Sequence, residues 1–200
     1  MAFYIPGVRE FSLLCGCVDA GKDALNNAIN VHGQNVTLLP GGIDEMQITD
    51  GLSKDTKIVM ADRKGYAKLA IENGLTIIPS FCFGEKWIHR TYLMPRPIRA
   101  FLYKTFKVGG TLLKGRGPSF LGYLGVSLGY VYGEPIPVRK QNPVDPEYLD
   151  EIHAKVQASV KSIFDRHKEH FGYAADETLT FVTVKEARAV HRDAKSVKGD

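Results

Sequence analysis

Helical and strand-like patterns alternate in the first part of the chain. Residues 21–30 place apolar side chains three and four positions apart, which predicts a helix, and Gly33 follows as its stop. Residues 35–42, NVTLLPGG, then form a short apolar run that closes on a proline and two glycines. This run predicts a buried strand that enters a tight turn.

The same order of helix and strand is repeated further along. Asp62 is placed to cap a second helix that runs through Asn73, and Gly74 is suited to end it. Residues 75–83, LTIIPSFCF, are almost wholly apolar. They predict a second buried strand, which Pro79 interrupts or ends.

A third strand and a long helix are predicted in the C-terminal half. Residues 129–138 read as a strand whose prolines place it near a sheet edge or at its own end. Asp145 is a good N-cap, Pro146 suits the first helical position, and one apolar stripe then continues to a stop at Gly172. Beyond this helix the stripe disappears, so residues 174–200 are predicted to be a charged, solvated tail.

The alternation of strand and helix predicts an α/β fold with a mostly parallel sheet flanked by helices. The 200 residues, of which 44% are hydrophobic, suffice for one domain with a hydrophobic core and leave little room for two. We therefore predict one domain over residues 1–173, followed by the tail.

The formal net charge of +4 conceals a strongly basic segment. Residues 86–133 contain eight Lys and Arg and no Asp or Glu, and aromatic residues are interspersed among the cations. This composition suits a surface that lies on anionic lipid headgroups. It also suits contacts with single-stranded nucleic acid, or an amphipathic cover whose cations are solvated. Because nothing resembles an RNA- or DNA-binding motif, we expect no nucleic-acid partner.

Cysteine content and hydropathy exclude several other classes of protein. Cys15, Cys17 and Cys82 are odd in number and lack paired spacing, which argues against a disulfide framework. With no second cysteine pair and no nearby histidine, the first two are interpreted as ordinary small residues, and we expect no metal site. No uncharged run reaches the roughly 18–20 residues that a membrane-spanning helix needs, and the N-terminus does not look like a signal peptide.

The sharpest local feature that could carry chemistry is the stretch from Pro40 to Glu45. A strand that ends in two glycines lets backbone N–H groups approach a ligand closely, and such groups can hold a phosphate or an oxyanion. Glu45 could orient an acceptor hydroxyl or anchor a positive partner. The spacing alone favours the alternative, a simple tight turn with a solvated carboxylate.

Several blocks of the chain are similar, in the right order, to the motifs of one known family. These blocks are Arg9-Glu10, Gly41-Gly42-x-x-Glu45, residues 63–70 with Gly74, Ile78-Pro79, Phe83-Gly84-Glu85, Gly115-Arg116-Gly117, Gly133-Glu134-Pro135-Ile136 and residues 164–172. Together they resemble the type 2 diacylglycerol acyltransferase family, which also includes monoacylglycerol and wax-alcohol acyltransferases. The resemblance covers nearly all of residues 3–173.

The resemblance implies acyl transfer from acyl-CoA, as co-substrate and without a further cofactor, to an acylglycerol or a long-chain alcohol. Diacylglycerol, giving triacylglycerol, is the first choice of acceptor. The resemblance also implies a glycerolipid-acyltransferase-like fold, a location at the cytoplasmic face of the endoplasmic reticulum or of lipid droplets, and membrane contact through residues 86–133. It leaves a homo-oligomer open.

The resemblance also assigns roles to particular residues. It gives Glu45 a supporting catalytic role. The candidates for substrate binding are Gly41, Gly42, Arg63, Pro79 and Arg116. The two arginines among them could neutralise CoA phosphates or lipid headgroups.

The chain departs from the family pattern at two places. The family's His-Pro-His-Gly motif, whose histidine is the general base, has no counterpart, since the chain contains no His-Pro dipeptide. His32-Gly33 ends a predicted helix and is not interpreted as catalytic. Residues 124–136, LGVSLGYVYGEPI, also lack the proline- and arginine-rich approach that is common in the family before Gly-Glu-Pro-Ile.

We therefore expect an N-terminally incomplete acyltransferase that is inactive by itself. The alternative is a catalytically inactive paralogue that binds lipid surfaces or an active partner.

Overall fold

The computed structural model describes residues 7–88, 90–93, 97–98, 101, 105, 111–114 and 126–193. The chain divides into two compact units. Unit 1 consists of Met1–Leu39 with Leu93–Thr111, and unit 2 of Pro40–Tyr92 with Leu112–Asp200. The structure thus divides the domain predicted over residues 1–173 between two units.

Unit 1 contains helices α1 (Val8–Leu14) and α2 (Lys22–Asn30). The helix predicted over residues 21–30 is confirmed by α2, which buries Leu25 and Ala28 on one side.

The strand predicted over residues 35–42 is wrong. Residues 35–39 adopt no regular structure, and Leu39 is 78% exposed. Within the described part of the chain no strand pairs with this run, and an apolar run without a ladder partner cannot satisfy its backbone groups as a strand.

Unit 2 holds the other elements. In chain order they are α3 (Gly42–Ile48), β1 (Asp55–Val59), α4 (Gly65–Asn73), β2 (Ser80–Phe83), α5 (Glu85–Ile88), β3 (Arg90–Leu93), β4 (Thr111–Lys114), β5 (Gly129–Tyr132), α7 (Pro146–His167), a 3₁₀ turn (Glu169–Phe171), β6 (Thr178–Val182) and α8 (Val184–Asp193). Of these, β3 and β4 each have one residue, Leu93 and Thr111, that is assigned to unit 1.

In the part of the chain that the structure describes, the strands form three two-stranded ladders. β1 pairs with β6 in parallel, from Asp55 opposite Thr178 to Val59 opposite Val182. β2 pairs with β5 in antiparallel orientation, and β3 pairs with β4. The predicted α/β class is confirmed, with a parallel pair alongside an antiparallel one.

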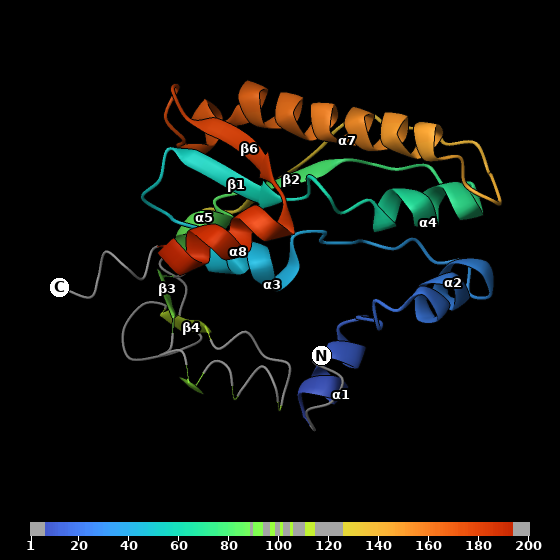
Figure 1. Cartoon of the computed structure of the whole chain (residues 1–200), viewed down its shortest axis with the longest axis horizontal. Coiled ribbons are helices and arrows are strands. Elements are labelled where there is room, and N and C mark those ends of the chain that lie inside the picture. The colour runs from blue at the N-terminus through green and yellow to red at the C-terminus, as the bar shows by residue number, and fades with distance from the viewer. Residues whose placement is uncertain are drawn as a thin grey trace. The chain divides into compact units, whose positions relative to one another are not determined.

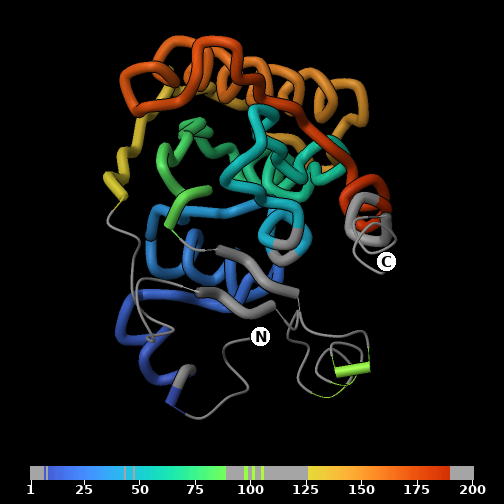
Figure 2. Tube along the Cα trace, turned by 90° about the vertical axis from the view of Figure 1, so that its left-hand side faces the viewer, coloured from blue at the N-terminus to red at the C-terminus, as the bar shows by residue number. Residues whose placement is uncertain are grey.

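The long helix α7 covers the strands. Asp145 caps it as predicted, since its Oδ1 accepts the Glu147 N–H at 3.2 Å, and Gly172 ends the following turn at φ 83°. In Figure 1, α7 lies along one side of β1 and β6, while α3 and α8 lie on the other side. Figure 2 shows the same helix across the top of unit 2 from a direction turned by 90°.

Aromatic rings pack together with aliphatic side chains in the core of unit 2. Phe83, which is fully buried, stacks on Phe171 with ring centroids 4.4 Å apart and lies near-parallel to Phe164 at 6.1 Å. Tyr173 meets Phe83 edge-on, and its hydroxyl accepts the Gly84 N–H at 3.0 Å. These contacts fix the end of β2 against α7.

The strand predicted over residues 75–83 is confirmed, with the interruption at Pro79. Ile77 forms an isolated antiparallel bridge with Ile136, and β2 resumes one residue after the proline. The Pro79 carbonyl accepts the Gly133 N–H at 2.8 Å. Proline has no N–H to donate, so the ladder is broken at this position.

The predicted tail after Tyr173 is corrected by β6 and α8. Residues 178–182 pair with β1, and Leu179 is buried. α8 begins with a capping box in which the Thr183 N–H donates to Glu186 Oε2 at 2.7 Å and the Glu186 N–H donates to Thr183 Oγ1 at 3.2 Å. The periodicity of this stretch could not show a pairing with a strand more than 100 residues earlier.

The second helix starts later than predicted. Its stop is confirmed, because Gly74 adopts φ 69° at the end of α4. However, Asp62 does not cap this helix, since its carboxylate accepts the first N–H of α8, that of Val184, at 3.2 Å. No helix in the part of the chain that the structure describes is both long and apolar enough to cross a bilayer.

Candidate active site

The Gly41-Gly42-x-x-Glu45 stretch forms the turn that opens α3. Gly42 adopts φ +56°, a conformation that favours glycine. A Cβ on Gly41 would overlap the Glu45 carboxylate, because this side chain folds back over the glycine. The motif therefore has a steric cause: Gly41 leaves the space that the Glu45 carboxylate fills.

The Glu45 carboxylate is joined to the carboxyl end of β1. Its Oε2 accepts the N–H of Val59, the last residue of that strand, at 2.9 Å. Val59 is fully buried. In α/β sheets the carboxyl ends of strands are where ligands commonly bind, so Glu45 occupies a position typical of a functional site.

The surroundings of Glu45 shift its protonation. The pKa of Glu45 is raised to about 7, chiefly because the carboxyl group is removed from solvent and to a smaller extent because Glu85 is close. The hydrogen bond from the Val59 N–H and the charge of Arg63 lower this pKa and so oppose the shift. The simple turn with a solvated carboxylate is therefore not what the structure contains. A carboxyl group with a pKa near neutrality can both take up and release a proton under physiological conditions.

A second carboxyl group accompanies Glu45. Glu85 follows Gly84 at the end of β2, and its own partial burial raises its pKa. It acts electrostatically on Glu45 and also on Cys82 and Tyr130, which interact with each other through the thiol and the hydroxyl. The ends of β1 and β2 thus bring together two carboxyl groups, a thiol and a phenol. Of these four groups, only the Glu45 carboxyl group was predicted from the sequence to have a role.

Arg63 holds the turn that carries Glu45. Its Nη1 donates to the Pro40 carbonyl at 2.6 Å, and its Nη2 pairs with Asp44 Oδ2 at 2.6 Å. Arg188 of α8 donates to the other oxygen of Asp44 at 3.1 Å. Arg63 was predicted to bind substrate, and in this structure its guanidinium engages the protein's own turn.

The remaining predicted substrate contacts have different surroundings. Pro79 is buried beside β5, where its carbonyl binds Gly133. Arg116 and most of the basic segment 86–133 lie outside the described residues. The first cation of that segment, Lys86, is buried and paired with Glu177, so it does not face lipid.

Among the described histidines of unit 2, His153 is buried, and it serves packing. One ring nitrogen, Nδ1, lies 2.9 Å from the Tyr66 hydroxyl, and Nε2 lies 3.2 Å from the Ala61 carbonyl. A ring that donates from Nε2 and accepts at Nδ1 satisfies both contacts. Both nitrogens are thereby occupied by the protein itself.

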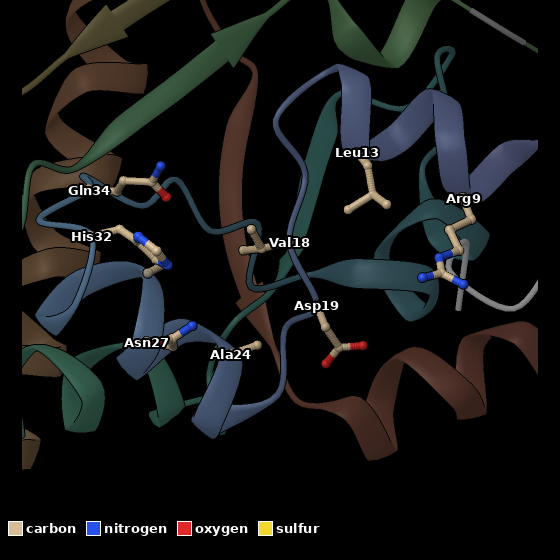
Figure 3. A pocket seen from close by; sticks show the side chains of 9 residues that line it. Arg9, Leu13, Val18, Asp19, Ala24, Asn27, His32 and Gln34 are labelled. Atoms are coloured by element: carbon tan, nitrogen blue, oxygen red, sulfur yellow. The ribbon is translucent and has the colours of Figure 1, made fainter.

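An open cavity of about 480 Å³ lies within unit 1 (Figure 3). It is lined by Arg9, Leu13, Val18, Asp19, Ala24, Asn27, Ala28, His32 and Gln34. None of the residues predicted to bind substrate lines it. Among the described residues, no group of three His, Cys, Asp or Glu is arranged to hold a metal ion.

Gly41→Ala is expected to detach Glu45 from β1, since the new methyl group would occupy the space of the carboxylate. The Val59 N–H would lose its acceptor, which should lower the free energy of unfolding by about 1–3 kcal/mol. Amide hydrogen exchange at Val59 should accelerate. Gly65→Ala is the matched control, because a Cβ there meets nothing within 4 Å. Equal exchange at Val59 in both variants would contradict the steric account of the motif.

Comparisons with known proteins bear on the whole chain. The model of a family described as diacylglycerol acyltransferase matches residues 1–182. Mouse (Mus musculus) 2-acylglycerol O-acyltransferase 1 is 28% identical over 192 residues, which cover 90% of this chain and 56% of that protein. Human (Homo sapiens) acyl-CoA wax alcohol acyltransferase 1 is 28% identical over 191 residues, covering 90% and 57%. Diacylglycerol O-acyltransferase 2 of Danio rerio is 26% identical over 190 residues, covering 88% and 52%.

The chain therefore spans about half the length of the curated relatives it matches. No solved structure matches it.

Proposed function

The chain belongs to the diacylglycerol acyltransferase family, and on this basis we propose that it serves the transfer of a fatty acyl group from acyl-CoA to a lipid hydroxyl. Diacylglycerol is the proposed acceptor, and monoacylglycerol and long-chain alcohols are its competitors, as the names of the relatives suggest. The proposed location is the cytoplasmic face of the endoplasmic reticulum membrane or the lipid-droplet surface, where such acceptors reside.

The observation that carries the proposal is the partly buried carboxyl group of Glu45, bound to the end of β1 and with a raised pKa. In the reaction, the acceptor oxygen loses its proton, attacks the thioester carbon and displaces the CoA thiolate. Glu45 has a pKa of about 7, so it can accept a hydrogen bond from the hydroxyl and share its proton. Glu85 would support it by raising this pKa.

The absence of a His-Pro dipeptide from the chain limits the rate that we expect of these 200 residues. A general base contributes about 10²–10⁴-fold, so turnover should be lower by that factor than in a relative that carries the family's histidine motif. Glu45 is proposed in the supporting role, orienting the hydroxyl.

Acyl transfer from radiolabelled oleoyl-CoA to dioleoylglycerol in detergent micelles tests the proposal. We expect slow formation of labelled triacylglycerol, and a further fall of at least about tenfold in Glu45→Gln. Glu151→Gln, on the exposed side of α7, is the control and should behave as the unmodified chain. Equal rates in all three proteins would refute the role of Glu45. Binding of oleoyl-CoA without turnover would instead favour the catalytically inactive paralogue.

A further inference from the structure

The ladder of β2 and β5 has two unlike faces. Because side chains alternate along a strand, Phe81 and Phe83 of β2 and Val131 of β5 point to the same side, where they pack in the core against α7. The opposite side carries Cys82 paired with Tyr130 and, beyond it, Ser80 paired with Tyr132. We call this second side the tyrosine face.

The tyrosine face is open and aromatic. Tyr130 is 59% exposed and Tyr132 69% exposed. Their rings are stacked, with centroids 6.5 Å apart and planes at 23°. Ile78 and Leu128, at the ends of the two strands, are also about half exposed. Aligned rings with apolar flanks present a rigid surface on which an alkyl chain can lie, while each hydroxyl remains available for hydrogen bonds.

The charges next to the tyrosine face determine which ligand it fits. Glu85 lies beyond the end of β2 and acts electrostatically on both Cys82 and Tyr130, and it also acts on Glu45. Two nearby cations are occupied: Arg63 is bound to Asp44, and Lys86 to Glu177. Among the described residues, a ligand with several phosphates would meet carboxyl groups here, while Arg63 and Lys86 are engaged by other carboxylates, which is unfavourable. A neutral hydroxyl group can donate a hydrogen bond to those carboxyl groups.

We propose that the tyrosine face binds the acyl acceptor, a neutral lipid with a free hydroxyl group, and does not bind the polyanionic CoA. The alkyl chain lies on the rings of Tyr130 and Tyr132, and the hydroxyl points toward Glu85 and Glu45. That this ligand is the acyl acceptor rests on the proposed function. That the tyrosine face binds a neutral lipid with a hydroxyl group does not depend on it. Both tyrosines fall within residues 124–136, where the chain departs from the family pattern, so the face is a place where acceptor specificity can differ from that of the relatives.

Binding of soluble ligands tests the proposal on the full chain. The probes are 1-decanol, decyl methyl ether, which lacks the donor, and free CoA, each titrated by calorimetry. We expect 1-decanol to bind, the ether to bind at least several-fold more weakly, and CoA not to compete with 1-decanol. The double variant Tyr130→Ser/Tyr132→Ser should weaken 1-decanol binding about tenfold or more.

Two controls separate the rings from other effects. Tyr130→Phe/Tyr132→Phe keeps both rings and should retain binding of 1-decanol. Phe11→Ser removes an exposed aromatic side chain from unit 1 and should change nothing. A diazirine-labelled decanol should crosslink to residues 128–132 of the unmodified chain, a readout that does not depend on the serine variant folding.

Several results would overturn the proposal. In the binding experiments, these are competition by CoA, equal binding of 1-decanol and its ether, or undiminished binding in a folded serine variant. Crosslinks outside residues 128–132 would also overturn it. So would a dimer, seen by sedimentation, that dissociates in the serine variant. The last would assign the tyrosine face to a second copy of the chain. If 1-decanol binds there but no acyl transfer occurs, the proposed function fails and the binding site stands. If transfer occurs and the tyrosine variants leave the KM for the acceptor unchanged, the site fails and the function stands.

Discussion

Glu177→Gln is expected to lower the free energy of unfolding by about 3–5 kcal/mol, because it leaves the charge of Lys86 buried without its counter-ion. The two side chains are only 6% and 5% exposed. Lys86 Nζ also donates to the Ser53 carbonyl at 3.1 Å and lies over the adjacent rings of Trp87 and Tyr173, 5.0 and 4.6 Å from their centroids. The amide of glutamine has nearly the shape of the carboxylate, so the change removes the charge without opening a cavity.

Urea denaturation at neutral pH measures this effect. The double variant Lys86→Met/Glu177→Gln removes both charges and should recover most of the loss. Asp176→Asn is the control, since Asp176 pairs with Lys54 at the surface at 2.6 Å, with both side chains about two-thirds exposed, and it should change stability little. A loss in Glu177→Gln no larger than that of the control would show that the buried pair does not stabilise the fold.

The Lys86–Glu177 pair also shows why part of the fold could not be predicted. The two residues are 91 positions apart, and each lies in a stretch whose local composition suggests solvent. Lys86 opens a basic segment, and Glu177 falls in a charged region after the long helix. The same holds for β1 and β6, whose hydrophobic signal is weak and whose strand character comes from pairing with each other.

The sequence correctly predicted the helix ends that are determined by interactions between residues close together in the chain. Asp145 caps α7, and Gly74 and Gly172 end their helices in left-handed conformations, as the sequence predicts. These features depend on side chains and backbone within four residues of one another. Asp62 shows the limit of such reasoning, because a good cap was used by a helix that begins 122 residues later.

The sequence predicted which residue of the candidate site is important, but not the surroundings of that residue in the fold. The resemblance of Gly41-Gly42-x-x-Glu45 to a family motif pointed to Glu45, whereas its burial, its bond to Val59 and its proximity to Glu85 all depend on how β1 and β2 end. The stacked tyrosines of β5 gave no local signal beyond two aromatic residues two positions apart. Their exposure on one face follows from the register of β5 against β2.

The free energy of unfolding should fall by about 3 kcal/mol more between pH 4.5 and pH 7 in the unmodified chain than in Glu45→Gln. Glu45 has an ordinary pKa of 4.5 when unfolded and a pKa of about 7 in the fold. Between these values the folded chain holds a proton that the unfolded chain has released. Raising the pH therefore favours unfolding, by about 1.4 kcal/mol for each pH unit.

The sign of the effect distinguishes a buried carboxyl group from an ordinary ion-paired one. A carboxylate stabilised by a cation would lose its contribution as the pH falls, whereas the contribution of Glu45 is complete below pH 4.5 and is lost as the pH rises to 7. Urea denaturation at intervals between pH 4.5 and 8 gives the free energy of unfolding of each protein as a function of pH. Subtracting one curve from the other removes the contribution of the titratable groups that both proteins share. Glu151→Gln, at the exposed surface of α7, should run parallel to the unmodified chain. If the curve of Glu45→Gln also runs parallel, Glu45 is ionised in the fold throughout this range and cannot share a proton with an acceptor hydroxyl near neutrality.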